Sequence, residues 1–234
     1  MEHFQAIYAA RAAEYHRMIA AEDLDGRLLP AIERVASLRG KRVIDLGTGT
    51  GRLPLLIGGQ AAQLVGLDLH RDMLRQHAAQ RQRQAGRWML VQGDMRRLPF
   101  RSAWADVVTA GWAIGHLRSW FAGDWQTQIG SVLDEMQRVV VPGGALIILE
   151  TLSTGSLTPA PPHAALAEYY DWLEQSWGFR RETIPTDYHF ASVDEAVERN
   201  EFFFGPELAT KIRAQGWARL PEWTGVWSKR KVHQ

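Results

Sequence analysis

The sequence predicts an α/β fold in which a mostly parallel sheet is covered by helices on both sides. Five short, largely apolar segments alternate with segments of helical period between Lys41 and Glu150. Strands that are apolar on both faces are typical of parallel sheets buried between helices. A glycine-rich loop joins the first apolar segment to its helix, and an aspartate ends the second.

The first two thirds of the chain can be divided into elements from these patterns. Residues 4–21 and 25–38 have apolar positions three and four apart, which predicts two amphipathic helices. The strands are expected at 43–46, 64–68, 89–94, 106–110 and 145–150. Helices are expected from Arg52, where Pro54 suits the first turn, and at 72–84 and 125–140. The segment Pro142-Gly143-Gly144 is expected to form a turn before the fifth strand.

The last third of the chain has a different pattern. The run Thr158-Pro159-Ala160-Pro161-Pro162 is expected to be a stiff connector. The elements expected after it are a helix at 163–177, a strand near 179–190, helical segments within 193–215 and a strand near 218–229. Because strands and helices no longer alternate, we expect the last strands to be antiparallel at the sheet edge.

Length and composition exclude several classes of protein. The chain has 234 residues, of which 46% are hydrophobic and 23% charged, as expected of one globular domain. Its net charge of +1 provides no bulk attraction for nucleic acid or an anionic membrane. The absence of cysteine excludes disulfides, thiolate metal sites and cysteine nucleophiles. With neither a signal-peptide core nor a membrane-length apolar run, the expected location is the cytoplasm.

The loop after the first strand carries the strongest chemical signal. Glycines at 47, 49 and 51 let the backbone turn tightly and approach a ligand, and the following helix offers its N-terminal N–H groups to an anion. A dinucleotide fingerprint needs G-x-G-x-x-G, whereas the spacing here is G-x-G-x-G. Asp68, at the end of the second strand, is suitably placed to accept hydrogen bonds from ribose hydroxyls.

Five segments in order resemble the motifs of class I S-adenosylmethionine (SAM)-dependent methyltransferases, of the small-molecule type 11 and 25 kind. These segments are DLGTGTG at 45–51, GLDLHRDML at 66–74, QGDMRRLPF at 92–100, ADVV at 105–108 with 111–117, and 133–149 with its Pro-Gly-Gly turn. The resemblance covers roughly residues 40–151. It implies a single domain with an N-terminal helical cap at 1–39, a SAM-binding core at 40–151, and a substrate lid and final strands at 152–234.

The resemblance also implies a Rossmann-like three-layer α/β/α sandwich with seven strands, the last antiparallel. SAM would bind across the C-terminal ends of the strands and leave as S-adenosylhomocysteine, and no metal is expected. Asp68 would hold the ribose, Asp94 the adenine amino group, and Gly47 and Gly49 would lie under the methionine part. Tyr8 and Tyr15 are candidates to cover that end. The residues expected to bind the cofactor are Tyr15, Asp45, Gly47, Thr48, Gly49, Gly51, Asp68, Leu69, Met73, Asp94, Met95, Ala110, Gly111 and Trp112.

Methyl transfer from a sulfonium needs positioning more than acid–base catalysis. His116 is our first candidate base because an ordinary imidazole pKa suits proton removal near neutrality. Glu150, at the end of the fifth strand, is the second. Trp120, Tyr170 and Tyr188 are expected to line the acceptor pocket. The phenylalanines at 202–204 are interpreted as a core helix face rather than a substrate site.

Several functions remain open on the sequence alone. The leading prediction is methyl transfer to an oxygen or nitrogen atom of an unidentified small molecule, by a monomer or homodimer. The segment Thr109-Ala110-Gly111-Trp112 stands where DNA amino-methyltransferases carry an Asn/Asp-Pro-Pro motif. An RNA or protein methyltransferase, a SAM-binding regulator without activity and an NAD(P) oxidoreductase are the alternatives. The low net charge disfavours nucleic acid as the acceptor.

Overall fold

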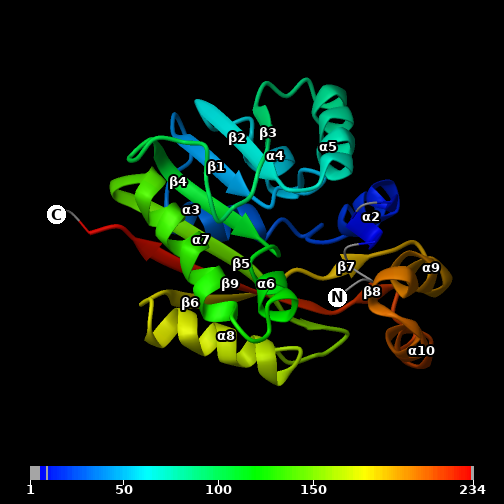
Figure 1. Cartoon of the computed structure of the whole chain (residues 1–234). Coiled ribbons are helices and arrows are strands. Elements are labelled where there is room, and N and C mark those ends of the chain that lie inside the picture. Colours follow the sequence, from blue (N-terminus) through cyan, green and yellow to red (C-terminus); the bar gives the residue numbers. More distant parts are fainter. Residues whose placement is uncertain (1–5, 9, 233–234) are drawn as a thin grey trace.

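Seven strands form one sheet in the order β3-β2-β1-β4-β5-β9-β6 in the computed structural model, which describes residues 6–8 and 10–232 (Figure 1). The strands of this sheet are β1 (Arg42–Leu46), β2 (Gln63–Asp68), β3 (Met89–Gln92), β4 (Ala105–Gly111), β5 (Val140–Thr154), β6 (Arg180–Pro185) and β9 (Glu222–Arg230). The neighbours from β3 to β5 are parallel, and β9 is antiparallel to both β5 and β6. The predicted fold class is confirmed.

Helices cover both faces of this sheet. Their bounds are α2 (Ala12–Ile19), α3 (Leu28–Val35), α4 (Arg52–Ile57), α5 (Arg71–Arg83), α6 (Gly115–Trp120), α7 (Trp125–Val139), α8 (Ala164–Gln175), α9 (Val193–Phe204) and α10 (Pro206–Gln215). Figure 1 shows α6, α7 and α8 together on one side of the sheet. The helix starts follow local chemistry: Ser192 caps α9 by accepting from Glu195 N, and Pro206 begins α10.

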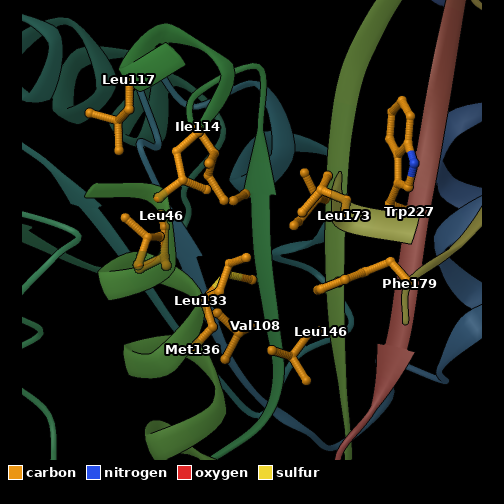
Figure 2. Close-up of a cluster of buried hydrophobic side chains, with 14 of the residues drawn as sticks. Leu46, Val108, Ile114, Leu117, Leu133, Met136, Leu146, Leu173, Phe179 and Trp227 are labelled. Carbon is orange, nitrogen blue, oxygen red and sulfur yellow. The ribbon is translucent and has the colours of Figure 1, made fainter. Parts of the chain in front are cut away.

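Alternate residues of the central strands enter two separate cores. On one face, Ile44, Val108 and Leu146 pack with Leu133 and Met136 of α7, the cluster drawn in part in Figure 2. Their chain neighbours Val43, Val107 and Ala145 pack on the opposite face with α3 and α4. Because side chains along a strand alternate between the two faces, a strand buried on both faces must be apolar at consecutive positions.

The structure differs from the sequence-based expectation at β5 and in the tail. β5 begins at Val140, and the expected Pro142-Gly143-Gly144 turn lies inside it as a register shift between the pairs Ala105–Val140 and Val107–Ala145. The strand expected near 179–190 is divided into β6 and β7 (Tyr188–His189). The last is divided into β8 (Arg219–Leu220) and β9 at Pro221, which has no N–H to donate.

A cap of helices and short strands lies at one end of the molecule. Figure 1 shows α2, α9, α10, β7 and β8 gathered there. Met18 and Ile19 of α2 pack with Ala196 of α9 and Ile212 of α10 in a small core of their own. Segments from both ends of the chain therefore close the same side of the sheet. No helix within the described part of the chain is long and apolar enough to cross a membrane.

Candidate active site

Two adjoining cavities lie between the sheet and this cap. The first, of about 280 Å³, is lined by the glycine loop and the ends of β1, β2 and β4. The second, of about 700 Å³, reaches from the cap to β5, the proline-rich connector and α8. The residues that line both cavities are Tyr8, Tyr15, Ile19, Arg52, Trp112, His116 and Trp120. These seven side chains form the boundary between the cavities.

The glycine loop has the conformation that its sequence predicts. Gly47, Gly49 and Gly51 have φ values of +61°, +54° and +100°. A Cβ atom at Gly47 would overlap with Ala113, which also lines the first cavity. The loop is held by Thr48 N, which donates to Leu67 O at 2.9 Å. The main chain thus forms one wall of the cavity where no side chain fits.

Asp68 connects the loop to the end of β2. Its Oδ2 accepts from Gly49 N and its Oδ1 from His70 N, each at 2.8 Å. Burial raises the pKa of this carboxyl, and the hydrogen bonds from His70 and Gly49 oppose the shift. Each carboxylate oxygen can accept more than one hydrogen bond. Asp68 therefore lines the first cavity with acceptor capacity left for a ligand.

Two further acids, which differ in their pKa values, line the first cavity. Asp45 is buried, accepts from Thr109 Oγ1 at 2.6 Å, and has its pKa raised by burial to about 7. Asp94 is more exposed, and Arg96 donates to it from Nη2 at 2.6 Å. That hydrogen bond lowers the pKa of Asp94. Asp94 is therefore a charged group, and Asp45 gains or loses its proton near neutrality.

The structure places most of the expected cofactor residues around one cavity. Those that line it are Tyr15, Asp45, Gly47, Thr48, Gly49, Asp68, Leu69, Met73, Asp94, Met95, Gly111 and Trp112. Gly51 and Ala110 do not. Gly51 precedes α4, where a Cβ would meet the His77 ring at 2.5 Å, so its role is conformational. Ala110 is fully buried, and its side chain packs in the core between the sheet and α7.

The second cavity has mainly aromatic walls. The expected pocket residues Trp120, Tyr170 and Tyr188 all line it. Phe203 and Phe204 of α9 line it as well, although we interpreted this segment as core. Trp112, at the boundary, has φ +50°, a rare conformation for a residue with a side chain, and its ring lies 3.5 Å from the Arg52 guanidinium carbon.

His116 differs from its expected state. Its Nε2 lies 2.9 Å from the Tyr8 hydroxyl, and its ring stacks on Trp120. Burial and the neighbouring His70 lower the pKa of His116 to about 4. His116 was predicted to be the base because an ordinary imidazole pKa suits this role, and its pKa in the structure is not the ordinary one. A backbone hydrogen bond with Trp112 opposes this shift, and together with the Tyr8 hydroxyl it holds the ring in place.

Glu150 lies beside His116 under the first turn of α6. It is 5% exposed, and its Oε1 accepts from Gly115 N at 2.8 Å. Burial raises the pKa of Glu150 to about 8, while the Gly115 N–H opposes the shift. Of the two expected catalytic residues, only Glu150 has a pKa near neutrality. Glu150 lines the second cavity but not the first.

A buried ion pair, missed by the sequence analysis, completes the boundary. Arg52 Nη2 lies 2.6 Å from Glu22 Oε1. A third charged side chain, Glu222, is close by, and burial together with the Glu22 charge raises its pKa well above the ordinary range. Burial and the Glu22 charge thus disfavour the charged form of Glu222, whereas Glu22 has Arg52 as its partner. An arginine directly after a glycine loop was the one available signal for this site.

The two adjoining cavities can hold two different ligands side by side. The first cavity offers main-chain groups and carboxylates to a ligand with an anionic end and hydroxyls, while the second offers aromatic surface and one acid. Because seven residues line both cavities, groups bound in each can meet at a boundary enclosed by side chains. Such enclosure favours group transfer over hydrolysis.

Comparison with known proteins agrees with this geometry. Residues 44–148 match a family described as a methyltransferase domain. The chain is 27% identical to the malonyl-[acyl-carrier protein] O-methyltransferase of Pseudescherichia vulneris, over 94% of this chain and 66% of that protein. It is 32% identical to the ubiquinone/menaquinone biosynthesis C-methyltransferase UbiE of Syntrophotalea carbinolica, over 52% of this chain and 48% of that protein.

The chain spans less than two thirds of the length of each of these relatives. A solved structure of a SAM dependent methyltransferase from Aquifex aeolicus has the same fold, with a TM-score of 0.57 and 14% identity over 86% of this chain and 88% of that one.

Proposed function

The chain belongs to the class I SAM-dependent methyltransferases, and on that premise we propose that it transfers a methyl group from SAM to an oxygen or nitrogen atom of a small molecule. The family match, the sheet order and the cofactor-side cavity support this proposal. The single observation that carries it is the shared boundary, where seven residues line both the first cavity and a second cavity of about 700 Å³. That volume suits a small organic acceptor.

The residues of the first cavity fit SAM. Gly47 lines the cavity at a place where a Cβ would overlap with Ala113. Asp68 has spare acceptor capacity for hydroxyls, and Asp45 and Asp94 provide further acceptors. When bound, SAM supplies a methyl group on a positively charged sulfur. Tyr8, Trp112 and Trp120 lie between the cavities and exclude water from the place where the two ligands would meet.

Two side chains are available to orient the acceptor and remove its proton. His116 is held by the Tyr8 hydroxyl and by a backbone hydrogen bond with Trp112, and it is stacked on Trp120, so its ring is a fixed part of the wall against which the acceptor would lie. Burial raises the pKa of Glu150 to about 8, so the carboxylate form of Glu150 is a stronger base than the His116 imidazole, whose pKa is about 4. We assign proton removal to Glu150 and orientation to His116.

The relatives methylate different acceptor atoms. The P. vulneris protein is named an O-methyltransferase and the S. carbinolica protein a C-methyltransferase. The proposal of an oxygen or nitrogen acceptor therefore rests on the second cavity of this chain, which contains an acid close to the boundary. A carbon acceptor needs activation of a C–H bond, whereas an O–H or N–H proton can pass directly to a carboxylate.

Labelled transfer distinguishes the acceptor classes. The full chain would be incubated with SAM carrying a tritium-labelled methyl group and, separately, with a low-molecular-weight metabolite fraction, total RNA and a protein fraction. We expect label in the metabolite fraction, and less of it with Asp68→Ala when SAM is below saturation. Label in RNA or protein alone would replace the proposal with the macromolecular alternative, and binding of SAM without transfer to any fraction would favour a regulator.

A further inference from the structure

Resting on the proposed function, we propose that the methyl acceptor is a basic amine, and that Glu150 binds its ammonium group and takes its proton. The proposal specifies the chemical class of ligand for the second cavity. It is based on one feature of that cavity, a buried carboxyl group that has no cationic partner among the described residues.

Glu150 is only half satisfied by the protein. One oxygen, Oε1, accepts from Gly115 N, and Oε2 accepts no hydrogen bond within residues 6–8 and 10–232. The side chain is 95% removed from solvent, yet it lines the second cavity. No arginine, lysine or histidine of the described residues forms an ion pair with it. A buried carboxylate is expected to have a cationic partner, which a ligand can provide.

The groups that face Glu150 from the surrounding elements do not provide a cation. Tyr8 approaches from the N-terminal segment, and Tyr169 and Tyr170 approach from α8. Burial raises the pKa values of all three phenols, so they are neutral. The Tyr170 hydroxyl donates to Thr151 O at 2.8 Å and is therefore directed away from the carboxylate.

Three basic side chains line the second cavity, and none of them forms an ion pair with Glu150. His163 caps α8 by accepting from Leu166 N. Arg52 lines the same cavity but is paired with Glu22 and lies over the Trp112 ring. His116 is neutral because burial and the neighbouring His70 lower its pKa to about 4. The positive charge that would balance Glu150 must therefore come from outside these side chains.

The walls around Glu150 suit an organic cation. The rings of Tyr8, Trp112, Trp120 and Tyr170 line the same cavity. Aromatic faces attract ammonium groups, most strongly where water is excluded. A ligand carboxylate or phosphate at this position would instead lie beside another acid and would find no unpaired cation there. The cavity therefore selects against anionic acceptors and favours amines with an apolar or aromatic body.

The proton balance of the reaction follows from this pairing. Because its pKa is about 8, Glu150 of the unliganded protein carries a proton at neutral pH and releases it to solvent when the ammonium group binds. The bound R–NH₃⁺ then gives one proton to Glu150 Oε2, which leaves R–NH₂ with a free lone pair. The nitrogen then forms a bond to the methyl carbon, the carbon–sulfur bond breaks with its electron pair left on sulfur, and the positive charge passes from sulfur to nitrogen. Burial raises the pKa of Glu150 to about 8, which brings it nearer to the value of about 10.4 typical of an alkylammonium.

The test compares three probes of similar size but different charge: phenethylamine, phenethyl alcohol and hydrocinnamate. Binding of each to the full chain saturated with S-adenosylhomocysteine would be measured by calorimetry, for the native chain, Glu150→Gln and Glu168→Gln. Glutamine keeps an oxygen for the Gly115 N–H. Glu168 lies on α8, is exposed and pairs with Arg118, so its variant is the matched control.

We expect phenethylamine to bind the native chain and the control variant with the same affinity. Its affinity for Glu150→Gln should be lower by about tenfold or more. The affinities of phenethyl alcohol for the native chain and for Glu150→Gln should agree within about twofold. Hydrocinnamate should bind the native chain more weakly than phenethylamine does. Amine binding that is unaffected by Glu150→Gln, or no preference for the amine over the alcohol, would overturn the inference. S-adenosylhomocysteine affinity, measured first, separates the two claims, because its absence would defeat the proposed function itself.

Discussion

The carboxylate of Glu22 lies 2.6 Å from the guanidinium of Arg52, and the two side chains are only 2% and 15% exposed. Glu22 follows α2 in the cap, and Arg52 is the first residue of the helix after the glycine loop. The pair therefore ties the cap to the cofactor side of the molecule. Because both residues line the second cavity and Arg52 lines both, the pair also fixes the boundary where transfer would occur.

Breaking this buried ion pair should lower the free energy of unfolding more than breaking an exposed ion pair does. Arg52→Met leaves Glu22 buried without its cation, and we expect a loss of about 3–5 kcal/mol in the free energy of unfolding. Arg34→Met removes an exposed pair with Glu182 and should cost less than about 1 kcal/mol. Urea denaturation followed by circular dichroism measures both. Equal losses in the two variants would mean that the Glu22–Arg52 pair does not anchor the cap.

Gly47 is expected to be intolerant of any side chain. Its φ of +61° is unfavourable for other residues, and a new Cβ would overlap with Ala113. We expect Gly47→Ala to destabilise the fold by about 1–3 kcal/mol and to abolish SAM binding. Gly59→Ala is the control, since its Cβ would meet no atom within 4 Å. Thermal melting and calorimetry that show Gly47→Ala to be as stable and as active in binding as Gly59→Ala would contradict the close approach.

Asp68 should matter for cofactor affinity. Asp68→Ala removes the acceptor that remains available to ribose hydroxyls, and we expect SAM binding to weaken by about 1–3 kcal/mol. Asp72→Ala, on the exposed first turn of α5, lines neither cavity and should leave affinity unchanged. Calorimetry with both variants decides the point, with melting curves to show that each is folded. Unchanged affinity in Asp68→Ala would remove this residue from the site.

Stability should fall with rising pH because of Glu150. Burial raises its pKa to about 8, whereas an unfolded chain has a glutamate pKa of about 4.3. Between these values the folded protein holds a proton that the unfolded chain has released, so the free energy of unfolding decreases as pH rises and levels off above about 8.

Glu150→Gln cannot titrate and should lose less stability over this range. The difference between the two forms from pH 5 to 8 is expected to be on the order of 3 kcal/mol. Chemical denaturation at several pH values measures it in the absence of ligand. Parallel stability curves for the native chain and the variant would show that Glu150 is solvated.

The sequence predicted the central sheet well because its strands are buried on both faces. Consecutive apolar residues such as Val43, Ile44 and Leu46 have few alternatives to a covered parallel strand, and the glycines after them have few alternatives to a tight loop. The tail was predicted less accurately. A proline ends β6 and another separates β8 from β9, and neither interruption changes the apolar pattern on either side.

The site was predicted where its residues are close in sequence and missed where the fold brings distant ones together. Glu22 and Arg52 are separated by a helix and a strand, and the sequence gives no reason to pair them. His116 was selected for its ordinary pKa, but burial lowers that pKa, and burial depends on residues as distant as Tyr8. Contacts of this kind are set by tertiary packing and leave no local pattern.

The central claim is that the crevice at the glycine loop holds SAM, and titration calorimetry of the full chain with SAM and, separately, with NADH tests it most directly. We predict micromolar binding of SAM at one site per chain, with Asp68→Ala weaker, and no binding of NADH. Binding of NADH with no binding of SAM would contradict the account.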